Sequence, residues 1–302
     1  MYDLIIIGSG PAGLSAAVYG KRAGLELLVL EKAPMSGGQI LNTYEVDNYL
    51  GLPGINGFDM GMQFRAHADK LGVDFREAEV TEICDRGGSW LVRTDIGEFE
   101  TKTAILATGA VHARLDVPGE EELSGMGVSY CATCDGAFFR GRTVAVVGGG
   151  DVALEDAIYL ARTCAKVYLI HRRDELRGAM VLQEELKRLE NVEILYHTTV
   201  EEIAGTEAVQ SLRIRDAESG SESELPVQGV FIAVGIHPNT ELVQGLLPLD
   251  EGGYISAGED CATAVPGLYA AGDVRKKPLR QIITAVADGA NAAVAAGMFC
   301  RK

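Results

Sequence analysis

The ten residues LIIIGSGPAG, at positions 4–13, contain the pattern that decides the fold. Residues 4–7 are wholly apolar and mostly β-branched, which is typical of a strand buried on both faces of a parallel sheet. A glycine-rich turn follows, and residues 14–23 have the Ala- and Leu-rich composition of a helix. A second apolar run, residues 27–30, ends at Glu31. This order of strand, turn, helix and strand predicts a βαβ unit.

The same plan recurs in the middle of the chain. Residues 143–147 read TVAVV, the turn GGGDVA follows, and a helical stretch at residues 154–162 leads to a second apolar run that ends at His171. Gly10 and Glu31 are 21 residues apart, and so are Gly150 and His171. The repeat predicts an α/β fold with two Rossmann-like (βαβ) nucleotide-binding domains.

The end of the chain returns to the first domain. Residues 267–273, GLYAAGD, resemble another strand that ends at a Gly-Asp pair, and residues 284–296 form an Ala-rich final helix. The second unit is therefore expected to be inserted into the first. We place the first domain at 1–112 and 241–302 and the inserted domain at 113–240.

Composition excludes several classes of protein. The chain has 302 residues, is 47% hydrophobic and carries a formal net charge of −16, which describes a globular protein that does not favour nucleic acid or anionic lipid. No apolar run approaches the ~20 residues of a membrane span, and we expect no signal peptide before the first strand. We expect a cytoplasmic protein, in which a disulfide among the six cysteines would be catalytic.

The first glycine turn has the spacing of a dinucleotide site. Gly8 would permit the tight turn, Gly10 the approach of a pyrophosphate, and Gly13 the close packing of helix on strand. Glu31 stands where an acid accepts hydrogen bonds from a ribose. The alternative is a glycine-rich turn with a purely structural role.

The second turn differs in its chemistry. Its glycines are followed by Ala153 in place of the third glycine, and basic residues replace the acid at the strand end. Arginines bind a 2′-phosphate in bidentate fashion, whereas an acid would repel it, so this turn is expected to bind NADP. The alternative is a solvated charge cluster paired with Asp174 and Glu175. The residues concerned are Gly148, Gly150, Asp151, Val152, Ala153, His171, Arg172, Arg173 and Arg177.

A pair of cysteines, Cys131 and Cys134, lies just before the second unit. In a cytosolic protein CxxC indicates a redox pair or half of a zinc site, and no second CxxC supplies the remaining zinc ligands. A dithiol beside a nucleotide site can take electrons from a reduced cofactor. Asp135 is either an acid or base for this chemistry or a turn residue before Gly136. The other cysteines are expected to be small buried apolar residues.

Together these motifs resemble the low-molecular-weight thioredoxin reductases over nearly the whole chain. The CATCD segment and the HRRxxxR segment are fairly specific, while the glycine turns are shared by many flavoproteins. Further motifs that match are Gly37-Gly38-Gln39, Ala107-Thr108-Gly109, Ala271-Gly272-Asp273 and Arg280-Gln281. The resemblance implies FAD on the first unit, in contact with Ser9, Gly10, Pro11, Ala12, Glu31, Lys32, Gly38, Gln39, Asn48, Val80, Gly272, Asp273, Arg280, Gln281 and Ile282.

The resemblance also implies a mechanism with two half-reactions. NADPH would give a hydride to FAD, the reduced flavin would open the Cys131–Cys134 disulfide, and the dithiol would reduce thioredoxin or a similar protein. Both reactions use one face of the flavin, and the family alternates them by rotating the NADPH domain. The final helix, from near Ile283, would aim its positive end at the flavin. A homodimer is expected, as in the family.

One departure and several alternatives remain. The family often has a small polar residue where this chain has Asp151 or Val152, and an acid near the pyrophosphate could weaken NADPH binding. Four alternative functions stay open: a related enzyme reduced by ferredoxin, a dithiol oxidase, a ferredoxin–NADP reductase and a non-enzymatic nucleotide sensor. The arginines disfavour the ferredoxin-reduced enzyme, and the CxxC pair would have no use in a ferredoxin–NADP reductase.

Overall fold

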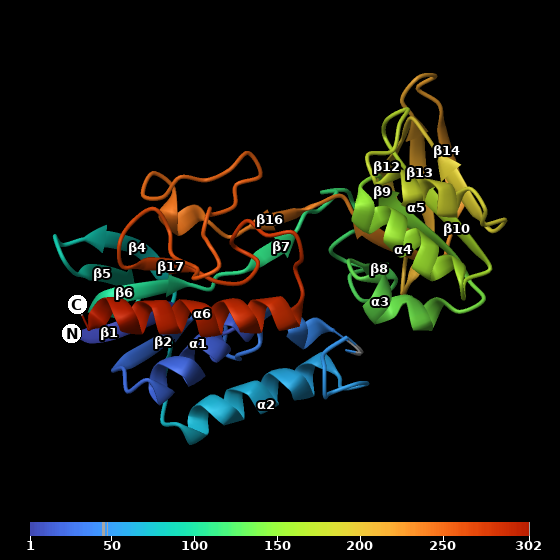
Figure 1. The fold of residues 1–302 in the computed structure, drawn as a ribbon. Helices are drawn as coiled ribbons and strands as arrows, with labels where there is room; N and C mark the ends of the chain where they lie inside the picture. The colour runs from blue at the N-terminus through green and yellow to red at the C-terminus, as the bar shows by residue number, and fades with distance from the viewer. Residues whose placement is uncertain (44–45, 47, 302) are drawn as a thin grey trace. The chain divides into compact units, whose positions relative to one another are not determined.

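The computed structural model describes residues 1–43, 46 and 48–301, and the chain forms two compact units in it (Figure 1). Unit 1 consists of Met1–Val111 and His237–Lys302, and unit 2 is His112–Ile236. The chain therefore passes between the units twice. At these crossings the short strands β7 (Ala110–His112) and β16 (Ile236–Pro238) pair with each other.

Unit 1 is built on a seven-stranded sheet in the order β3-β2-β1-β6-β5-β4, with β17 also paired to β6. Its central strands are parallel, and their apolar runs are buried, as expected from the sequence; Ile7 aligns with Leu30 on one side and Leu106 on the other. The strands are β1 (Tyr2–Ile7), β2 (Leu27–Glu31), β3 (Asp74–Glu77), β4 (Val80–Asp85), β5 (Trp90–Thr94), β6 (Gly97–Leu106) and β17 (Leu268–Ala270).

The helices of unit 1 begin where the sequence supplies a turn or a cap. Helix α1 (Pro11–Arg22) begins with proline in its first turn and ends in Lys21 and Arg22, which suit the negative end of a helix. Helix α2 (Gly57–Lys70) is capped by Asn56, whose side chain accepts the N–H of Asp59 at 2.7 Å. Two short 3₁₀ turns, η1 (Gly38–Asn42) and η3 (Glu241–Val243), complete the set together with α6 (Ile282–Cys300).

Helix α6 corrects the expectation that no apolar run approaches the length of a membrane span. It has 19 residues with a mean hydropathy of 1.5, so by length and composition alone it could cross a membrane, although 39% of that stretch is buried inside the protein. In unit 1 this helix runs along α1 (Figure 1). The contact is close because Gly289 has no side chain, and a Cβ there would lie 2.0 Å from the carbonyl oxygen of Ala12.

We predict that Gly289→Ala destabilises the protein, because the new methyl would overlap the α1 backbone. Overpacking of this kind lowers the free energy of unfolding by about 1–3 kcal/mol. A loss of ~2 kcal/mol would lower the melting temperature by roughly 4–8 °C. Gly297→Ala on the same helix is the matched control, since its methyl would meet nothing closer than Leu25 at 3.7 Å. Thermal unfolding monitored by circular dichroism checks both. Equal melting temperatures for the two variants would contradict the packing argument.

Unit 2 contains a five-stranded parallel sheet in the order β11-β10-β9-β15-β8, the second Rossmann-type core expected from the sequence. Its strands are β8 (Val128–Ser129), β9 (Thr143–Gly148), β10 (Lys166–Ile170), β11 (Val192–Leu195) and β15 (Gly229–Ala233). The sequence did not predict the antiparallel sheet of β12 (Thr198–Gly205), β13 (Val209–Asp216) and β14 (Glu222–Pro226). The helices are α3 (Ala132–Asp135), α4 (Asp151–Ala161) and α5 (Met180–Leu186), with η2 (Gly136–Phe139) after α3.

Three helices begin earlier than the sequence pattern indicated. Helix α1 begins at Pro11 and α4 at Asp151, where residues 14 and 154 were expected, and α6 begins at Ile282 where residue 284 was expected. The cause is the same in α1 and α4, because the last residues of each glycine turn already form the first helical turn. The free N–H groups of that turn therefore lie at the turn itself.

Candidate functional site

The first glycine turn has the geometry that a dinucleotide site requires. Gly8 adopts φ +100°, and a Cβ there would lie 2.5 Å from the carbonyl oxygen of Ala107. A Cβ on Gly13 would lie 1.9 Å from the carbonyl oxygen of Gly8, so both positions exclude any side chain. Gly10 differs, because its Cβ would meet only Gly37 at 3.9 Å. The turn thus leaves open space above Gly10 and the start of α1, where N–H groups bind phosphate.

Glu31 is held in place at the end of β2. The N–H and Oγ of Ser9 donate to its Oε2 at 2.7 and 2.8 Å, and the N–H of Ala33 donates to Oε1 at 3.0 Å. A carboxylate accepts about four hydrogen bonds, so Glu31 keeps capacity for ribose hydroxyls. The side chain is therefore both an anchor for the turn and a suitable acceptor.

A hollow of about 190 Å³ lies beside Glu31 and was not predicted from the sequence. Its floor includes Phe75, whose ring lies 3.5 Å from the guanidinium carbon of Arg65. Arg65 also donates to the Oγ of Ser36 at 2.9 Å. This stacked, polar recess has the character of a pocket for the adenosine end of a dinucleotide. Its lining residues are Glu31, Ala33, Pro34, Ser36, Arg65, Phe75, Arg76 and Glu77.

Two buried polar atoms test whether unit 1 fits FAD. Asp273 Oδ1 and Arg280 Nε have no hydrogen-bond partner among the residues that the structure describes. Buried polar atoms are normally paired, so unpaired ones call for an explanation such as a bound ligand. Both belong to the set that the family resemblance assigns to FAD. Together with the open space over Gly10 they show that the residues present fit this cofactor.

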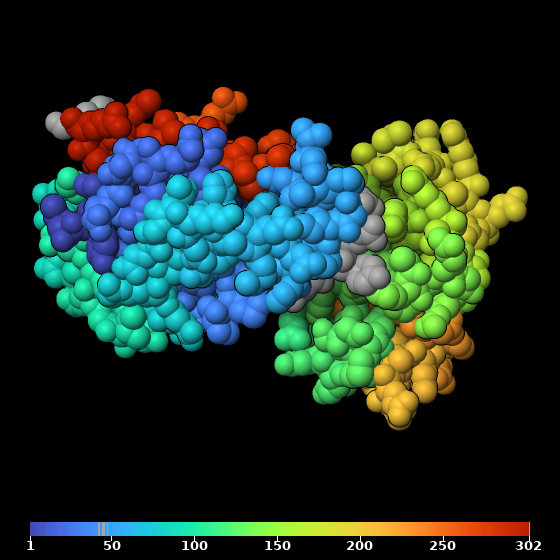
Figure 2. Space-filling view, turned by 90° about the horizontal axis from the view of Figure 1, so that it is seen from below, coloured from blue at the N-terminus to red at the C-terminus, as the bar shows by residue number. Residues whose placement is uncertain are grey.

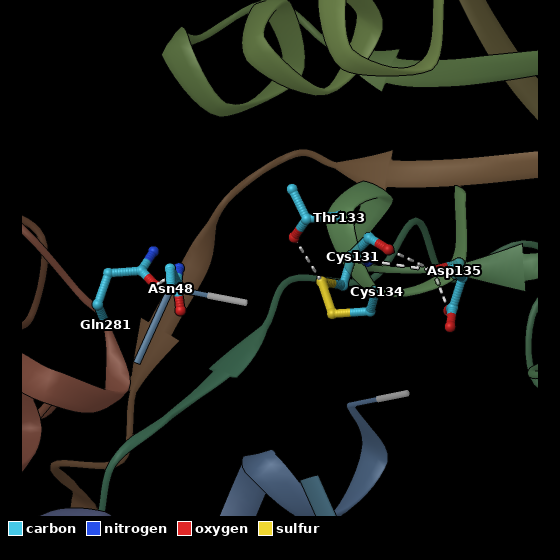
Figure 3. Close-up of a disulfide and its surroundings, with 7 residues drawn as sticks. Asn48, Cys131, Thr133, Cys134, Asp135 and Gln281 are labelled. Carbon is cyan, nitrogen blue, oxygen red and sulfur yellow. Dashed lines mark hydrogen bonds between the residues drawn. A yellow bond between two sulfur atoms is a disulfide. The ribbon is translucent and has the colours of Figure 1, made fainter. Parts of the chain in front are cut away.

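Several other residues that are expected to contact FAD form hydrogen bonds within the protein. The side-chain amide of Gln39 donates to the carbonyl of Ala110, and Asn48 donates to Gln281 at 2.9 Å (Figure 3). Gln281 caps α6 in a capping box with Thr284. The Asn48–Gln281 bond and the capping box hold the start of α6 in place. Gly38 and Lys32 are exposed, Ile282 begins α6 and Val80 begins β4.

The Ala107-Thr108-Gly109 motif follows β6 directly and binds the returning chain. Thr108 Oγ1 donates to the carbonyl of Asn239 at 2.7 Å, and the Asn239 amide donates back to the Thr108 carbonyl at 2.8 Å. The N–H of Asn239 also bonds the carbonyl of Gly109 at 3.0 Å. The motif thus fixes the point where the chain re-enters unit 1.

The second glycine turn is closed by the segment that carries the arginines. The N–H groups of Arg177 and Gly178 donate to the carbonyl of Gly149 at 2.7 and 3.1 Å. Asp151 Oδ1 accepts the N–H of Ala179 at 2.7 Å, so this carboxylate is used to hold the segment. Val152 is 54% exposed, and Gly148 and Ala153 pack closely at the base of the turn. A Cβ on Gly150 would meet nothing within 4 Å, which leaves room for a phosphate.

The basic residues divide into two roles. Arg172, Arg173 and Arg177 are exposed, and none forms an ion pair within the part of the chain that the structure describes, including with Asp174 or Glu175. His171 is only 4% exposed, and its Nε2 lies 2.9 Å from the carbonyl oxygen of Glu175. Burial, followed by the nearby arginines, lowers its pKa. His171 therefore shapes the turn, while the arginines are available for an anion.

Cys131 and Cys134 form a disulfide, with Cα atoms 5.3 Å apart, at the start of α3 (Figure 3). Cys134 is 9% exposed and Cys131 is more accessible. Ser129 Oγ donates to Asp135 Oδ2 at 2.6 Å, and the N–H of Cys131 donates to Ser129 Oγ at 3.1 Å. Ser129, which the sequence did not single out, thus connects the acid to the first cysteine. Among the described residues no group of three metal-ligating side chains exists.

The four other cysteines are free, and only two are buried. Cys164 and Cys261 are buried as expected, whereas Cys84 and Cys300 are partly exposed. Burial raises the pKa of the Cys261 thiol to about 12, with the charge of Asp288 adding to the effect. A thiol with so high a pKa is unreactive, so Cys261 serves as a packing residue.

A buried acid near the disulfide was also missed by the sequence. Glu120 is 2% exposed and accepts the Tyr130 hydroxyl at 2.7 Å and the N–H of Asp116 at 2.7 Å. Burial, followed by the Glu120 contact, raises the pKa of Tyr130 to about 12. The ring of Tyr130, which directly precedes Cys131, stacks on His112 at the chain crossing. The cluster ties the crossing segment to the residue before the disulfide.

Comparison with known proteins gives one consistent result. Residues 2–289 match the family described as pyridine nucleotide-disulphide oxidoreductase. The chain is 46% identical over 290 residues to a thioredoxin reductase of Listeria innocua, covering 96% of this chain and 91% of that protein. A thioredoxin reductase of Bacillus subtilis is 43% identical, covering 97% and 93% of the two chains. The crystal structure of thioredoxin reductase from Streptococcus pyogenes shares 41% identity and a TM-score of 0.85, covering 100% of this chain and 98% of that one.

Proposed function

The chain belongs to the pyridine nucleotide-disulphide oxidoreductase family and, within it, to the thioredoxin reductases, and we propose that it moves electrons from NADPH to thioredoxin through FAD and Cys131–Cys134. The observation that carries this proposal is the disulfide in the same unit as a glycine turn with three arginines that form no ion pair among the described residues. A nucleotide-binding protein without disulfide chemistry would have no use for that pair.

The two turns receive different nucleotides in this proposal. Glu31 carries a negative charge where a 2′-phosphate would stand, so unit 1 takes FAD. Arg172, Arg173 and Arg177 supply positive charge at the corresponding place in unit 2, so unit 2 takes NADPH. When bound, FAD supplies the step between a two-electron hydride donor and a disulfide. Because Asp151 is held by Ala179, it anchors the arginine segment and does not act as a free charge at the pyrophosphate.

The disulfide and Asp135 would perform the thiol chemistry. Reduction gives two thiols, and the thiolate of one attacks the disulfide of the partner protein to form a mixed disulfide. The second thiolate then releases reduced partner and restores the Cys131–Cys134 bond. We assign Asp135 to proton transfer with these sulfurs, because Ser129 fixes its carboxylate through Oδ2.

The two chain crossings are candidates for a hinge. The chain leaves unit 1 after Val111 and re-enters it at His237, so only two short segments join the units. We propose that unit 2 rotates about these segments between reduction of the disulfide and reduction of the partner. The pairing of Asn239 with Thr108 would hold the unit 1 side of the hinge firm.

We also propose that two copies of the chain form a dimer through unit 1. Phe58 and Met62, one turn apart on α2, are 48% and 43% exposed, and Val294 and Met298 on α6 are 43% and 63% exposed. Figure 2 shows the segment that contains α2, light blue to cyan, uncovered on this face. Apolar stripes of this kind are typical of association surfaces. A cytoplasmic location follows from the proposed chemistry, because the dithiol needs a reducing compartment.

Anaerobic titration of the purified protein tests the function. We expect NADPH to bleach the flavin band at lower concentration than NADH, and added thioredoxin to be reduced with NADPH, as read by insulin precipitation. Bleaching by reduced ferredoxin and not by NADPH would support the ferredoxin-dependent alternative. Rapid oxygen consumption with a small dithiol would support an oxidase, and bound nucleotide without turnover would support a sensor.

A further inference from the structure

A cluster of buried charges lies behind the Gly272-Asp273 turn in unit 1. Asp288 on α6 is 6% exposed, although the rest of this helix is mostly apolar. Its carboxylate accepts the N–H of Gly272 at 3.0 Å, two bonds from Arg275 at 2.9 and 3.0 Å, and one from Lys277 at 3.1 Å. The side chains of Arg275 and Lys277 are 12% and 5% exposed. Buried charges are stable only when paired, and here two cations face one anion.

The second anion in contact with this cluster is Asp273, whose side chain is 29% exposed although its Oδ1 atom is buried. Its Oδ1 lies 3.4 Å from Lys277 Nζ and forms an ion pair, yet the same atom lacks a hydrogen-bond partner among the described residues. The carboxylate is therefore balanced in charge while one buried oxygen keeps its capacity to accept a bond. Such an oxygen is suited to a hydroxyl of a ligand.

The two cations, Arg275 and Lys277, differ in the groups that they contact. Arg275 is engaged within the protein by four hydrogen bonds, because in addition to its two bonds with Asp288 it donates to the carbonyls of Ala257 and Gly258 at 2.9 and 3.0 Å. Lys277 instead joins three parts of the site: Asp288, Asp273 and the hydroxyl of Thr284, 3.4 Å away, in the capping box of α6. Lys277 therefore touches both elements that the FAD site needs, the Gly-Asp turn and the start of α6.

We infer that Lys277 is a positioning residue for FAD: its ammonium bridges Asp288 and Asp273 and so holds the Asp273 carboxylate ready to accept a hydroxyl of the cofactor. This inference rests on the proposed FAD binding by unit 1. Without the ammonium, Asp273 loses its fixed neighbour, while Asp288 keeps Gly272 and Arg275. The effect should therefore appear in cofactor binding through Asp273.

The test is a double-mutant cycle in which the FAD dissociation constant is measured by ultrafiltration of the holoenzyme. Lys277→Met and Asp273→Asn should each weaken FAD binding about tenfold, since each removes one interaction with a charged group. The double variant should bind FAD no more weakly than Asp273→Asn alone, because both changes act on the same contact. Lys276→Met is the matched control, as its side chain is 68% exposed, and it should bind FAD like the wild type.

The outcomes separate the inference from the proposed function. Wild-type affinity in Lys277→Met, or losses that multiply in the double variant, would overturn the positioning role, because a purely structural lysine would act independently of Asp273. If Lys277→Met does not fold, Lys277→Gln replaces it, because its amide still donates to Asp288. Wild-type FAD affinity in Lys277→Gln, or losses that multiply when it is combined with Asp273→Asn, would likewise overturn the positioning role. A wild-type protein that retains no FAD would overturn the proposed function itself.

Discussion

Replacing Cys134 by serine should abolish thioredoxin reduction while the flavin is still reduced by NADPH. Thiol exchange with a protein disulfide needs a second sulfur in the same site to release the product, and serine cannot form that bond. Losing an intramolecular partner of this kind lowers the rate by about 10³-fold or more. Steady-state thioredoxin reduction and anaerobic flavin bleaching, measured on the same preparation, give the two rates.

Cys84→Ser is the control for this result. Cys84 is a free, partly exposed cysteine in β4, so its replacement tests whether loss of another cysteine sulfur has the same effect. We expect it to behave like the wild type in both assays. Thioredoxin reduction by Cys134→Ser within tenfold of the wild-type rate would show that the electrons take another path.

Replacing Arg172 and Arg173 together by alanine should remove the preference for NADPH over NADH. An arginine bound to a phosphate contributes about 1.5–3 kcal/mol, so each loss should lower kcat/KM for NADPH by roughly 10- to 100-fold. NADH has no 2′-phosphate, and its kcat/KM should stay nearly unchanged. Flavin reduction by each nucleotide in the stopped flow provides the comparison.

Arg162→Ala is the matched substitution in the same unit. Arg162 is exposed at the C-terminal end of α4, whereas the arginine pair follows β10 beside the segment that closes the turn at the start of α4. We expect its NADPH and NADH kinetics to be those of the wild type. An equal fall in NADPH and NADH efficiency in the Arg172/Arg173 variant would mean that the arginines stabilise the turn and do not recognise the phosphate.

The fold could be predicted where local pattern and topology agree. The run LIIIGSGPAG and its repeat at 143–153 indicated both parallel sheets, because continuous apolar strands followed by glycine turns have few other uses. The antiparallel sheet β12–β14 was missed, since its strands alternate polar and apolar residues without a turn signal as strong as the glycine motifs. The length of α6 was underestimated at both ends, because the helix begins at Ile282, directly after its capping residue Gln281, and continues to Cys300 beyond the Ala-rich stretch.

Sequence motifs could identify candidate site residues that lie close together in the chain, but not groups of residues that meet from distant segments. Arg65, Phe75 and Ser36 form one recess from three segments, and no spacing in the sequence connects them. No spacing in the sequence connects Asp288 with Arg275 and Lys277 either. An acid inside an Ala-rich helix was nevertheless a signal, because a buried carboxylate needs charged or hydrogen-bonding partners. His171 was expected to bind the nucleotide, but its ring is buried under Gly149.

The most direct test of the electron path is the number of electrons that the purified holoenzyme accepts. Anaerobic titration with dithionite should show that the wild type takes up two electron pairs per chain, one for FAD and one for the Cys131–Cys134 disulfide. Cys134→Ser should take up one pair. Equal uptake by the two proteins would contradict the account, because the disulfide would then not be part of the path.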